Sequence, residues 1–272
     1  MSGFAASSFL VALPITLATA AALQAATLAA ALRGGRHSAV DVTWGAGFVA
    51  IAALACALGW GNGPNARRLL ILLLTACWGL RLAGHIFLRL RGHEGEDPRY
   101  DELLARAGAA RTRFAITHIY LPQGLTQWFV SLPVQMAMFQ RGGIGVLGAV
   151  GVALWAVGFF FEAVGDHQLT RFRQDPASRD RVLDTGLWRY TRHPNYFGDA
   201  CVWWGLSLLT FAHWPGVVTI GSPVLMTYLL TRGTGAELLE RTINDRRPGY
   251  VDYVRRTSGF LPLPKRRSPR GV

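Results

Sequence analysis

Seven long runs of apolar residues constrain what this chain can fold into more than any other feature. A helix needs about 20 mostly apolar residues to cross a bilayer, and each run approaches or exceeds that length. Strands would show period-two alternation between turn residues, which is not seen here. We therefore predict an all-α integral membrane bundle of seven transmembrane helices, at residues 8–32, 39–61, 68–90, 114–139, 144–165, 196–214 and 215–232.

The composition agrees with a membrane protein. Hydrophobic residues make up 51% of the chain and charged residues only 16%, whereas a soluble domain carries roughly 25% charge. A disordered chain needs low hydrophobicity, so the composition excludes both an ordinary soluble globule and disorder.

The formal net charge of +12 suggests nucleic-acid binding at first sight, but its distribution indicates a membrane orientation. Of the 28 Lys and Arg residues, 23 follow the odd-numbered runs and 3 follow the even-numbered ones. This bias predicts an external N-terminus and a cytoplasmic C-terminus in the inner (cell) membrane, with no nucleic-acid partner. Because Met1–Leu10 has no basic residue ahead of its apolar run, we expect the first span to be retained.

A set of polar and ionisable side chains lies in the inner halves of the predicted spans. Arg81 and His85 are four residues apart and share one helix face, and Arg81 lies about 13 Å from the span end, too deep to snorkel easily. Snorkelling is an equal alternative for Arg89 and Asp166, which lie nearer the ends. Ionisable groups inside a membrane are costly and are functional by default. We predict one polar cavity, open to the cytoplasm, formed by Asp41, Trp44, Arg81, His85, Arg89, His118, Tyr120, Gln123, Gln127, Glu162, Asp166, Asn195, Tyr196 and Asp199.

Two other patterns point away from a metal or a soluble dinucleotide fold. The three cysteines are odd in number and form no CxxC pair, so we expect neither a disulfide framework nor a zinc site. The segment 143–148 fits GxGxxG, but no strand precedes it, and close helix packing through small residues explains it better.

The most specific stretch is Gly186-Leu-Trp-Arg-Tyr-Thr-Arg-His-Pro-Asn-Tyr-Phe-Gly-Asp199. It resembles the C-terminal domain of the steroid 5α-reductase family, in particular its bacterial branch. Shorter stretches that begin at Asp41, Gly95 and Ser131 also resemble that branch, so the resemblance spans most of the chain. It implies NADPH-dependent reduction of a carbon–carbon double bond conjugated to a carbonyl in a lipid (steroid-like, isoprenoid or fatty-acyl).

The resemblance also implies a cofactor site. Asn195 and Asp199 match the family's cofactor-holding pair, and Asp166 and Arg173 fit its acid–Arg pair. Arginine side chains are forked donors suited to phosphate oxygens, although positive-inside topology explains them without a ligand. The predicted cofactor-binding residues are Asp166, Arg171, Arg173, Arg189, Arg192, Asn195, Asp199 and Arg241.

One departure concerns the proton donor. Steroid-reducing members have a Tyr after the His of the third span, where this chain has Ile86. We therefore expect His85 to act as the acid, with Asp41 fixing its tautomer or charge, and Tyr120 is the second candidate. The predicted substrate-binding residues are Trp44, Arg81, Gln123 and Gln127.

These assignments divide the chain into a lipid-substrate half, 1–140, and a cofactor half, 141–272. We expect the lipid to enter from the inner leaflet; the sequence does not indicate an oligomeric state. One alternative is an S-adenosylmethionine-dependent methyltransferase of the isoprenylcysteine or phospholipid type, which shares the RHPxYxG signature but usually has fewer spans. Its acidic pair would come from Glu237 or Glu240. A non-enzymatic membrane scaffold would explain the basic tail but not the polar residues inside the spans.

Overall fold

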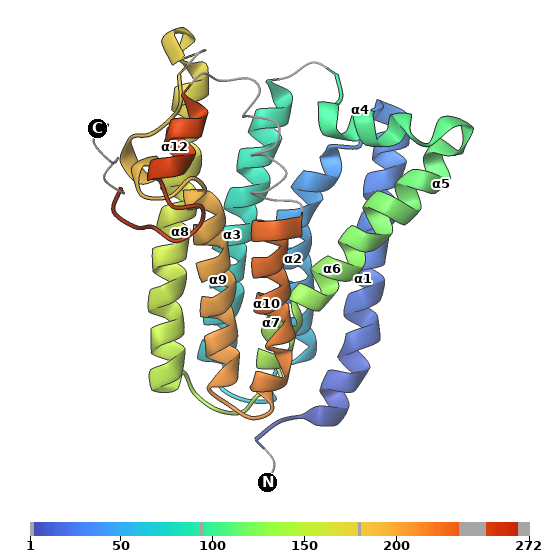
Figure 1. Cartoon of the computed structure of the whole chain (residues 1–272). Helices are drawn as coiled ribbons and strands as arrows, with labels where there is room; N and C mark the ends of the chain where they lie inside the picture. The colour runs from blue at the N-terminus through green and yellow to red at the C-terminus, as the bar shows by residue number, and fades with distance from the viewer. Residues whose placement is uncertain (1–2, 93–94, 179–180, 234–248, 266–272) are drawn as a thin grey trace. The chain divides into compact units, whose positions relative to one another are not determined.

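The computed structural model describes residues 3–92, 95–178, 181–233 and 249–265, which form helices joined by turns (Figure 1). Over these ranges no strand occurs, and the only extended pairings are two isolated bridges, Phe4 with Gln140 and Thr191 with Ser258. The all-α prediction is therefore confirmed for the described residues. The chain divides into two compact units, which we describe separately: unit 1 comprises Met1–Gly148 and Leu206–Ser222, and unit 2 comprises Ala149–Gly205 and Pro223–Val272.

Four helices are long and apolar enough to cross a membrane. They coincide with the first, second, third and fifth predicted spans, because a long apolar run is a local signal that needs no tertiary information. Their bounds are α1 (Ala6–Gly34), α2 (Ala39–Leu58), α3 (Asn65–Arg91) and α8 (Gly145–Gln174).

The fourth predicted span is divided into short helices. Pro122 and Pro133 each lie in the first turn of a new helix, where the missing backbone N–H costs nothing. The pieces are α5 (Arg111–Ala115), the π-helix η2 (Ile116–Tyr120), α6 (Leu121–Val130) and α7 (Leu132–Ala137).

The last two predicted spans are also shorter than expected. Within the described ranges, neither is among the helices long and apolar enough to cross a membrane alone. A turn joins them, closed by a 2.8 Å hydrogen bond from Gly216 N to His213 O. The elements are α9 (Pro194–Phe211), the 3-10 helix η5 (Gly216–Thr219), α10 (Gly221–Tyr228) and the π-helix η6 (Leu229–Gly233).

In unit 1, α2 packs between α1 and α3, and α6 packs against α1 and α2 (Figure 1). The α2–α3 contact is close because both helices place a glycine at it. A Cβ atom on Gly45 would lie 2.5 Å from the carbonyl oxygen of Gly79, so neither position tolerates a side chain. Phe48, Ile51 and Trp78 are fully buried beside this crossing.

In unit 2, α8 and α9 cross at a second glycine pair. A Cβ atom on Gly158 would lie 2.5 Å from the carbonyl oxygen of Gly198, and the converse distance is also 2.5 Å. The loop between the helices contains η3 (Pro176–Ser178) and η4 (Gly186–Arg189), and the C-terminal segment contains α12 (Tyr250–Arg256). This crossing brings the first turns of α9 against the C-terminal half of α8.

Candidate functional site

The predicted site residues are divided between the two units. Unit 1 contains Asp41, Trp44, Arg81, His85, Tyr120, Gln123 and Gln127. Unit 2 contains Asp166, Arg171, Arg173, Arg189, Arg192, Asn195 and Asp199, whereas Arg241, Glu237 and Glu240 lie outside the described residues. The structure gives the geometry of each group, and the meeting of both groups at one cavity stays a prediction.

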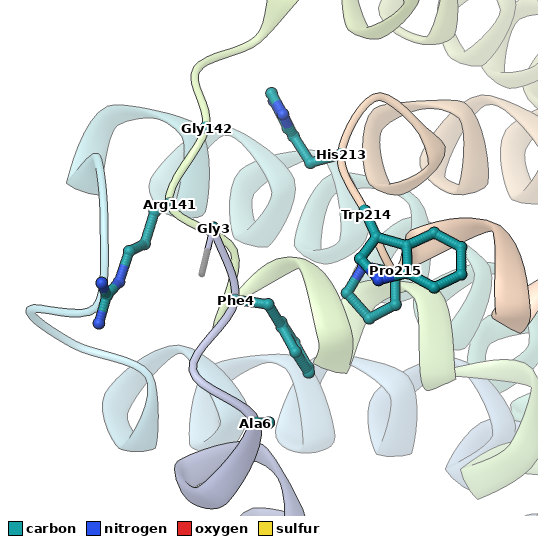
Figure 2. A pocket seen from close by; sticks show the side chains of 8 residues that line it. All are labelled: Gly3, Phe4, Ala6, Arg141, Gly142, His213, Trp214 and Pro215. Carbon is teal, nitrogen blue, oxygen red and sulfur yellow. The ribbon is translucent and has the colours of Figure 1, made fainter. Parts of the chain in front are cut away.

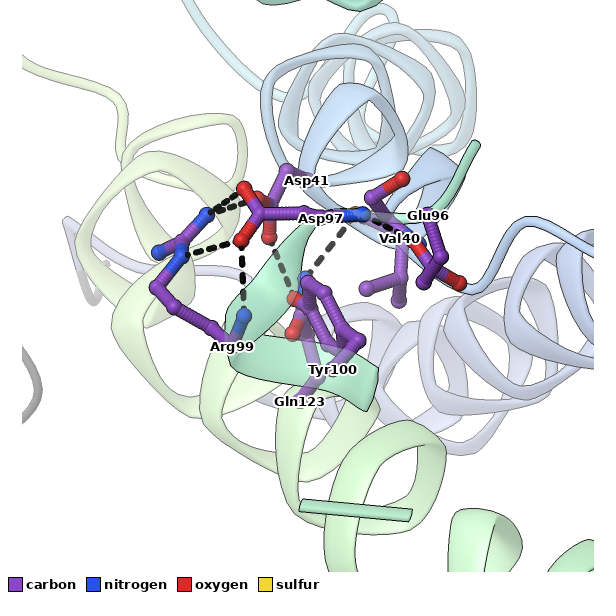
Figure 3. A network of polar contacts seen from close by, with 8 residues as sticks. Val40, Asp41, Glu96, Asp97, Arg99, Tyr100 and Gln123 are labelled. Carbon is purple, nitrogen blue, oxygen red and sulfur yellow. Dashed lines mark hydrogen bonds and ion pairs between the residues drawn. The ribbon is translucent and has the colours of Figure 1, made fainter. Parts of the chain in front are cut away.

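Asp41 lies at the start of α2, where the segment after α3 returns with the short helix α4 (Pro98–Ala105) to contact α2 (Figure 3). Its Oδ1 accepts a 2.6 Å hydrogen bond from the Tyr100 hydroxyl, and its Oδ2 accepts a 3.0 Å bond from Arg99 Nη2. Arg99 also donates to both carboxylate oxygens of Asp97. Tyr100 and Arg99 are therefore structural partners of Asp41 that sequence reasoning missed, although 95–100 was one of the stretches that carried the resemblance.

Glu96 attaches the same loop to the beginning of α2. Its carboxylate accepts hydrogen bonds from the backbone N–H groups of His37 and Ser38, and from Asp97 N at 2.9 Å. Burial by itself would raise the pKa of Glu96, but these bonds and one from the Ser38 side chain outweigh burial and lower it. Glu96 is thus a charged cap for a helix start whose own residues provide no side-chain cap.

Charge in this loop is balanced among neighbours. Burial would raise the pKa of Asp97, but hydrogen bonds from Arg99 lower it, and the Asp97 bond and the nearby Asp41 charge raise the pKa of Arg99. Burial and the Asp41 charge raise the pKa of Tyr100, which therefore donates to Asp41 as a neutral phenol.

Tyr120, Gln123 and Gln127 lie along η2 and α6 and all hydrogen-bond toward α2. The Tyr120 hydroxyl lies 3.0 Å from His37 Nδ1, and Gln123 Nε2 donates to Val40 O at 2.9 Å. Gln127 Nε2 donates to the carbonyl oxygens of Thr43 and Trp44 at 3.1 and 2.7 Å. The structure therefore brings these three predicted residues together in one seam between helices, a role that their polarity alone did not indicate.

The remaining predicted residues of unit 1 lie on α2 and α3. The Trp44 ring packs edge-on against Phe48, with the centroids 5.0 Å apart. Arg81 and His85 are half-buried, one turn apart on α3. Both retain the shared helix face that their spacing predicts.

In unit 2, the structure joins two of the predicted cofactor residues. Asn195, in the first turn of α9, donates from Nδ2 to Oδ1 of Asp166 on α8 at 3.1 Å. Glu162 and Asp199 are buried, at 2% and 7% exposure, on the same two helices. Three carboxylates and one amide thus lie along the α8–α9 contact.

The predicted cofactor-binding arginines among the described residues of unit 2 fall into two groups. Arg171, Arg173 and Arg189 are exposed. Arg192 instead donates from Nη1 to the carbonyl oxygens of Val254 and Thr257, each at 3.0 Å. These carbonyls end α12, where no intrahelical donor is available, so Arg192 is a helix C-cap in addition to any role toward a ligand.

The C-terminal segment of unit 2 docks on the motif stretch 186–199, a contact that sequence reasoning missed (Figure 1). The Tyr253 hydroxyl donates to Trp188 O at 2.7 Å, and Leu263 N donates to Tyr190 O at 3.0 Å. Asp184 pairs with Arg256 and Lys265 at 3.1 and 3.0 Å. The segment 249–265 is therefore part of the structure that positions the motif.

Two arginines in unit 1 are buried. Arg67 and Arg68 are two of the three basic residues counted after the even-numbered runs, and they are 2% and 1% exposed. Arg67 donates to Ala137 O and Leu209 O, and Arg68 donates to Met138 O. They are buried because carbonyls at the ends of α7 and α9 need donors.

An open cavity of about 630 Å³ lies at one end of unit 1, where the residues before α1 meet two turns (Figure 2). The Arg141 side chain points away from Trp214 and Pro215 there. None of the predicted site residues lines this cavity, whose walls are Gly3, Phe4, Ala6, Arg141, Gly142, His213, Trp214 and Pro215. Within the described residues, no group of three or more His, Cys, Asp or Glu side chains is placed to hold a metal ion.

The comparison with protein families matches residues 27–257 to a family described as "Protein of unknown function (DUF1295)". The chain belongs to the DUF1295 family. The matched region includes every predicted site residue of both units. Comparisons of this DUF1295 protein with curated proteins and with solved structures give no match.

Proposed function

We propose that this protein is a membrane oxidoreductase that uses NADPH to reduce a carbon–carbon double bond conjugated to a carbonyl group in a lipid. The observation that carries the proposal is the Asn195–Asp166 hydrogen bond at the α8–α9 contact, with Glu162 and Asp199 buried on the same helices. Buried carboxylates in apolar helices are costly and mark functional sites by default. Asn195 also belongs to the motif that resembles the steroid 5α-reductase family, and Asp166 matches the acid of that family's acid–Arg pair.

The donor chemistry of unit 2 suits NADPH. Arg171, Arg173 and Arg189 are exposed, and a guanidinium matches phosphate oxygens in a two-pronged geometry, so they would hold the cofactor's phosphates. Asn195 and Asp166 would receive amide and hydroxyl groups of the nicotinamide half. When bound, NADPH supplies a hydride.

The chain's own part in the chemistry is to bind the lipid carbonyl and hold a proton near its oxygen. In this proposal His85 donates a hydrogen bond to that oxygen and stabilises the negative charge that develops there. Tyr120 is the second candidate for this donor, and His37 Nδ1, which its hydroxyl contacts, could return a proton to it. The surrounding apolar helices exclude water, which strengthens the interaction.

Ligand-induced thermal stabilisation tests the proposal. The protein purified in detergent is heated with NADPH, NADH or S-adenosylmethionine, and NADPH is expected to raise the melting temperature most because bound ligand stabilises the folded state. Stabilisation by S-adenosylmethionine alone would refute the reductase and support the methyltransferase.

A substitution tests the placement of the cofactor. Asn195→Ala is expected to weaken NADPH binding at least about tenfold, because it removes a hydrogen-bonding group at a partly buried site. Asn62→Ala is the matched control, since Asn62 bonds only the nearby Gly59 O among its described contacts, in unit 1. Equal NADPH affinity in the two variants would show that the cofactor is not held at Asn195.

A further inference from the structure

Gln24 is a buried amide in the middle of α1. It is 4% exposed, and neither Nε2 nor Oε1 hydrogen-bonds any described residue. Its Cγ lies 3.0 Å from the position that a Cβ on Gly124 of α6 would occupy, so the absence of a side chain at Gly124 makes room for it. Nearly all buried polar side chains in proteins have a hydrogen-bond partner, which makes this amide an exception that needs an explanation.

Gln127 presents a second unsatisfied atom, and its orientation is fixed. Both of its Nε2 protons are donated to carbonyl oxygens, those of Thr43 and Trp44. Because carbonyls only accept, the amide cannot be turned over without losing both bonds. Oε1 is therefore a true acceptor, and it is buried without a donor among the described residues.

The two amides lie at the crossing of α1, α2 and α6. Gly124, which contacts Gln24, precedes Gln127 by three residues, so the two positions are neighbours on α6, about 5–6 Å apart at Cβ. The hydroxyl oxygen of Thr27, three residues after Gln24, lies 2.7 Å from the hydroxyl oxygen of Thr43. Gln127 bonds the carbonyl oxygen of the same Thr43, which links all three helices at one level.

The chemistry of the two amides selects their partner. Gln127 Oε1 needs a donor, and Gln24 offers donors and one acceptor. A carboxylate could not donate to Gln127, and an ammonium ion would bring an unpaired charge into an apolar interior. A hydroxyl group satisfies both, because it donates to Gln127 Oε1 and accepts from Gln24 Nε2.

We propose that Gln24 and Gln127 form a binding site for one hydroxyl group inside unit 1. The group belongs either to a bound water or to an alcohol function of a lipid. The site shares Gln127 with the predicted substrate-binding residues, but it does not rest on NADPH binding, because it contains no residue of unit 2.

The sign of a melting-temperature change tests the site. Gln24→Leu keeps the side-chain size and removes the amide. If a hydroxyl is bound, the variant melts about 2–4 °C lower, the shift expected when one or two neutral hydrogen bonds are lost. If the amide is truly unsatisfied, the variant melts higher than the unmodified protein, and the proposal is wrong. Thr19→Val is the matched control on α1, because Thr19 bonds only the carbonyl of Ile15 in the described contacts.

Two measurements then identify the hydroxyl. Melting temperatures of the protein measured with 1-tetradecanol and with tetradecane distinguish binding of the hydroxyl group from binding of the alkyl chain. If only the alcohol stabilises the protein, and this effect is lost in Gln24→Leu and kept in Thr19→Val, the site binds a lipid alcohol. A response to neither probe, with isolated density between the two amides in a high-resolution map, assigns it to water. A map in which the amides bond directly to each other, with no density between them, would overturn the proposal even if Gln24→Leu melts lower.

Discussion

Removing the Glu96 carboxylate should release the loop that caps α2. In Glu96→Ala, three backbone N–H groups, those of His37, Ser38 and Asp97, lose their acceptor. Loss of a helix N-cap acceptor costs about 0.5–2 kcal/mol, and the bond to Asp97 adds about 1 kcal/mol in a partly exposed position. We expect a total loss of about 1.5–3 kcal/mol, which corresponds to a melting temperature about 3–12 °C lower.

The pH dependence of stability gives a second, independent measure. The folded state lowers the pKa of Glu96, so the folded protein favours the ionised carboxylate. Its contribution is present above the ordinary carboxyl pKa of about 4.3 and is lost as the pH falls through the lower pKa of the folded state. Below about pH 4.3, the difference in melting temperature between the unmodified protein and Glu96→Ala should therefore shrink.

Thermal unfolding in detergent, followed by tryptophan fluorescence, measures the shift, and hydrogen exchange at His37 and Ser38 reports the cap directly. Glu102→Ala is the control, because Glu102 is exposed and pairs with Arg106 only as a surface ion pair, worth well under about 1 kcal/mol. If Glu96→Ala melts at the same temperature as Glu102→Ala and leaves exchange unchanged, the carboxylate is not the cap and the reasoning fails.

Three further substitutions test other contacts. Arg192→Ala should make 249–265 more sensitive to limited proteolysis, because it removes the C-cap of α12, whereas Arg189→Ala, at an exposed position, should not. Gly79→Ala should lower the melting temperature, because its Cβ would lie 2.7 Å from a backbone oxygen of α2. Gly84→Ala on the same helix, where nothing lies within 4 Å, should leave the melting temperature unchanged or raise it. A lower melting temperature for Gly84→Ala than for Gly79→Ala would contradict the close packing. Arg67→Met should lower the free energy of unfolding by about 2–4 kcal/mol or prevent folding, since buried carbonyls would lose their donors. A neutral result would show that the guanidinium does not hold these carbonyls.

Local signals predicted much of the helical framework. The apolar runs located α1, α2, α3 and α8 because length and hydropathy belong to each run alone. The fourth predicted span contains Pro122 and Pro133, and the structure divides it into helices that begin near each proline. How the short pieces pack could not be predicted, since no local pattern specifies it.

The site was predictable in its residue types and less so in its contacts. Asn195 and Asp166 were assigned to one site, and the structure joins them. Gln123 and Gln127 bond backbone carbonyls of α2, and such partners carry no side-chain signature in a sequence. The partners of Arg67 could not be predicted for the same reason, because only the folded chain shows which helix ends meet its guanidinium.

The docking of 249–265 on the motif has a consequence for the order of synthesis. The motif ends at Asp199, but Tyr253 and Leu263, which bond its backbone, follow more than fifty residues later. At about 5–20 residues per second, the motif waits roughly 3–13 s after its own synthesis before these partners exist. During that interval the stretch around Trp188 is exposed to the translation machinery and to chaperones, so the protein's last segment determines when its most specific sequence becomes structured.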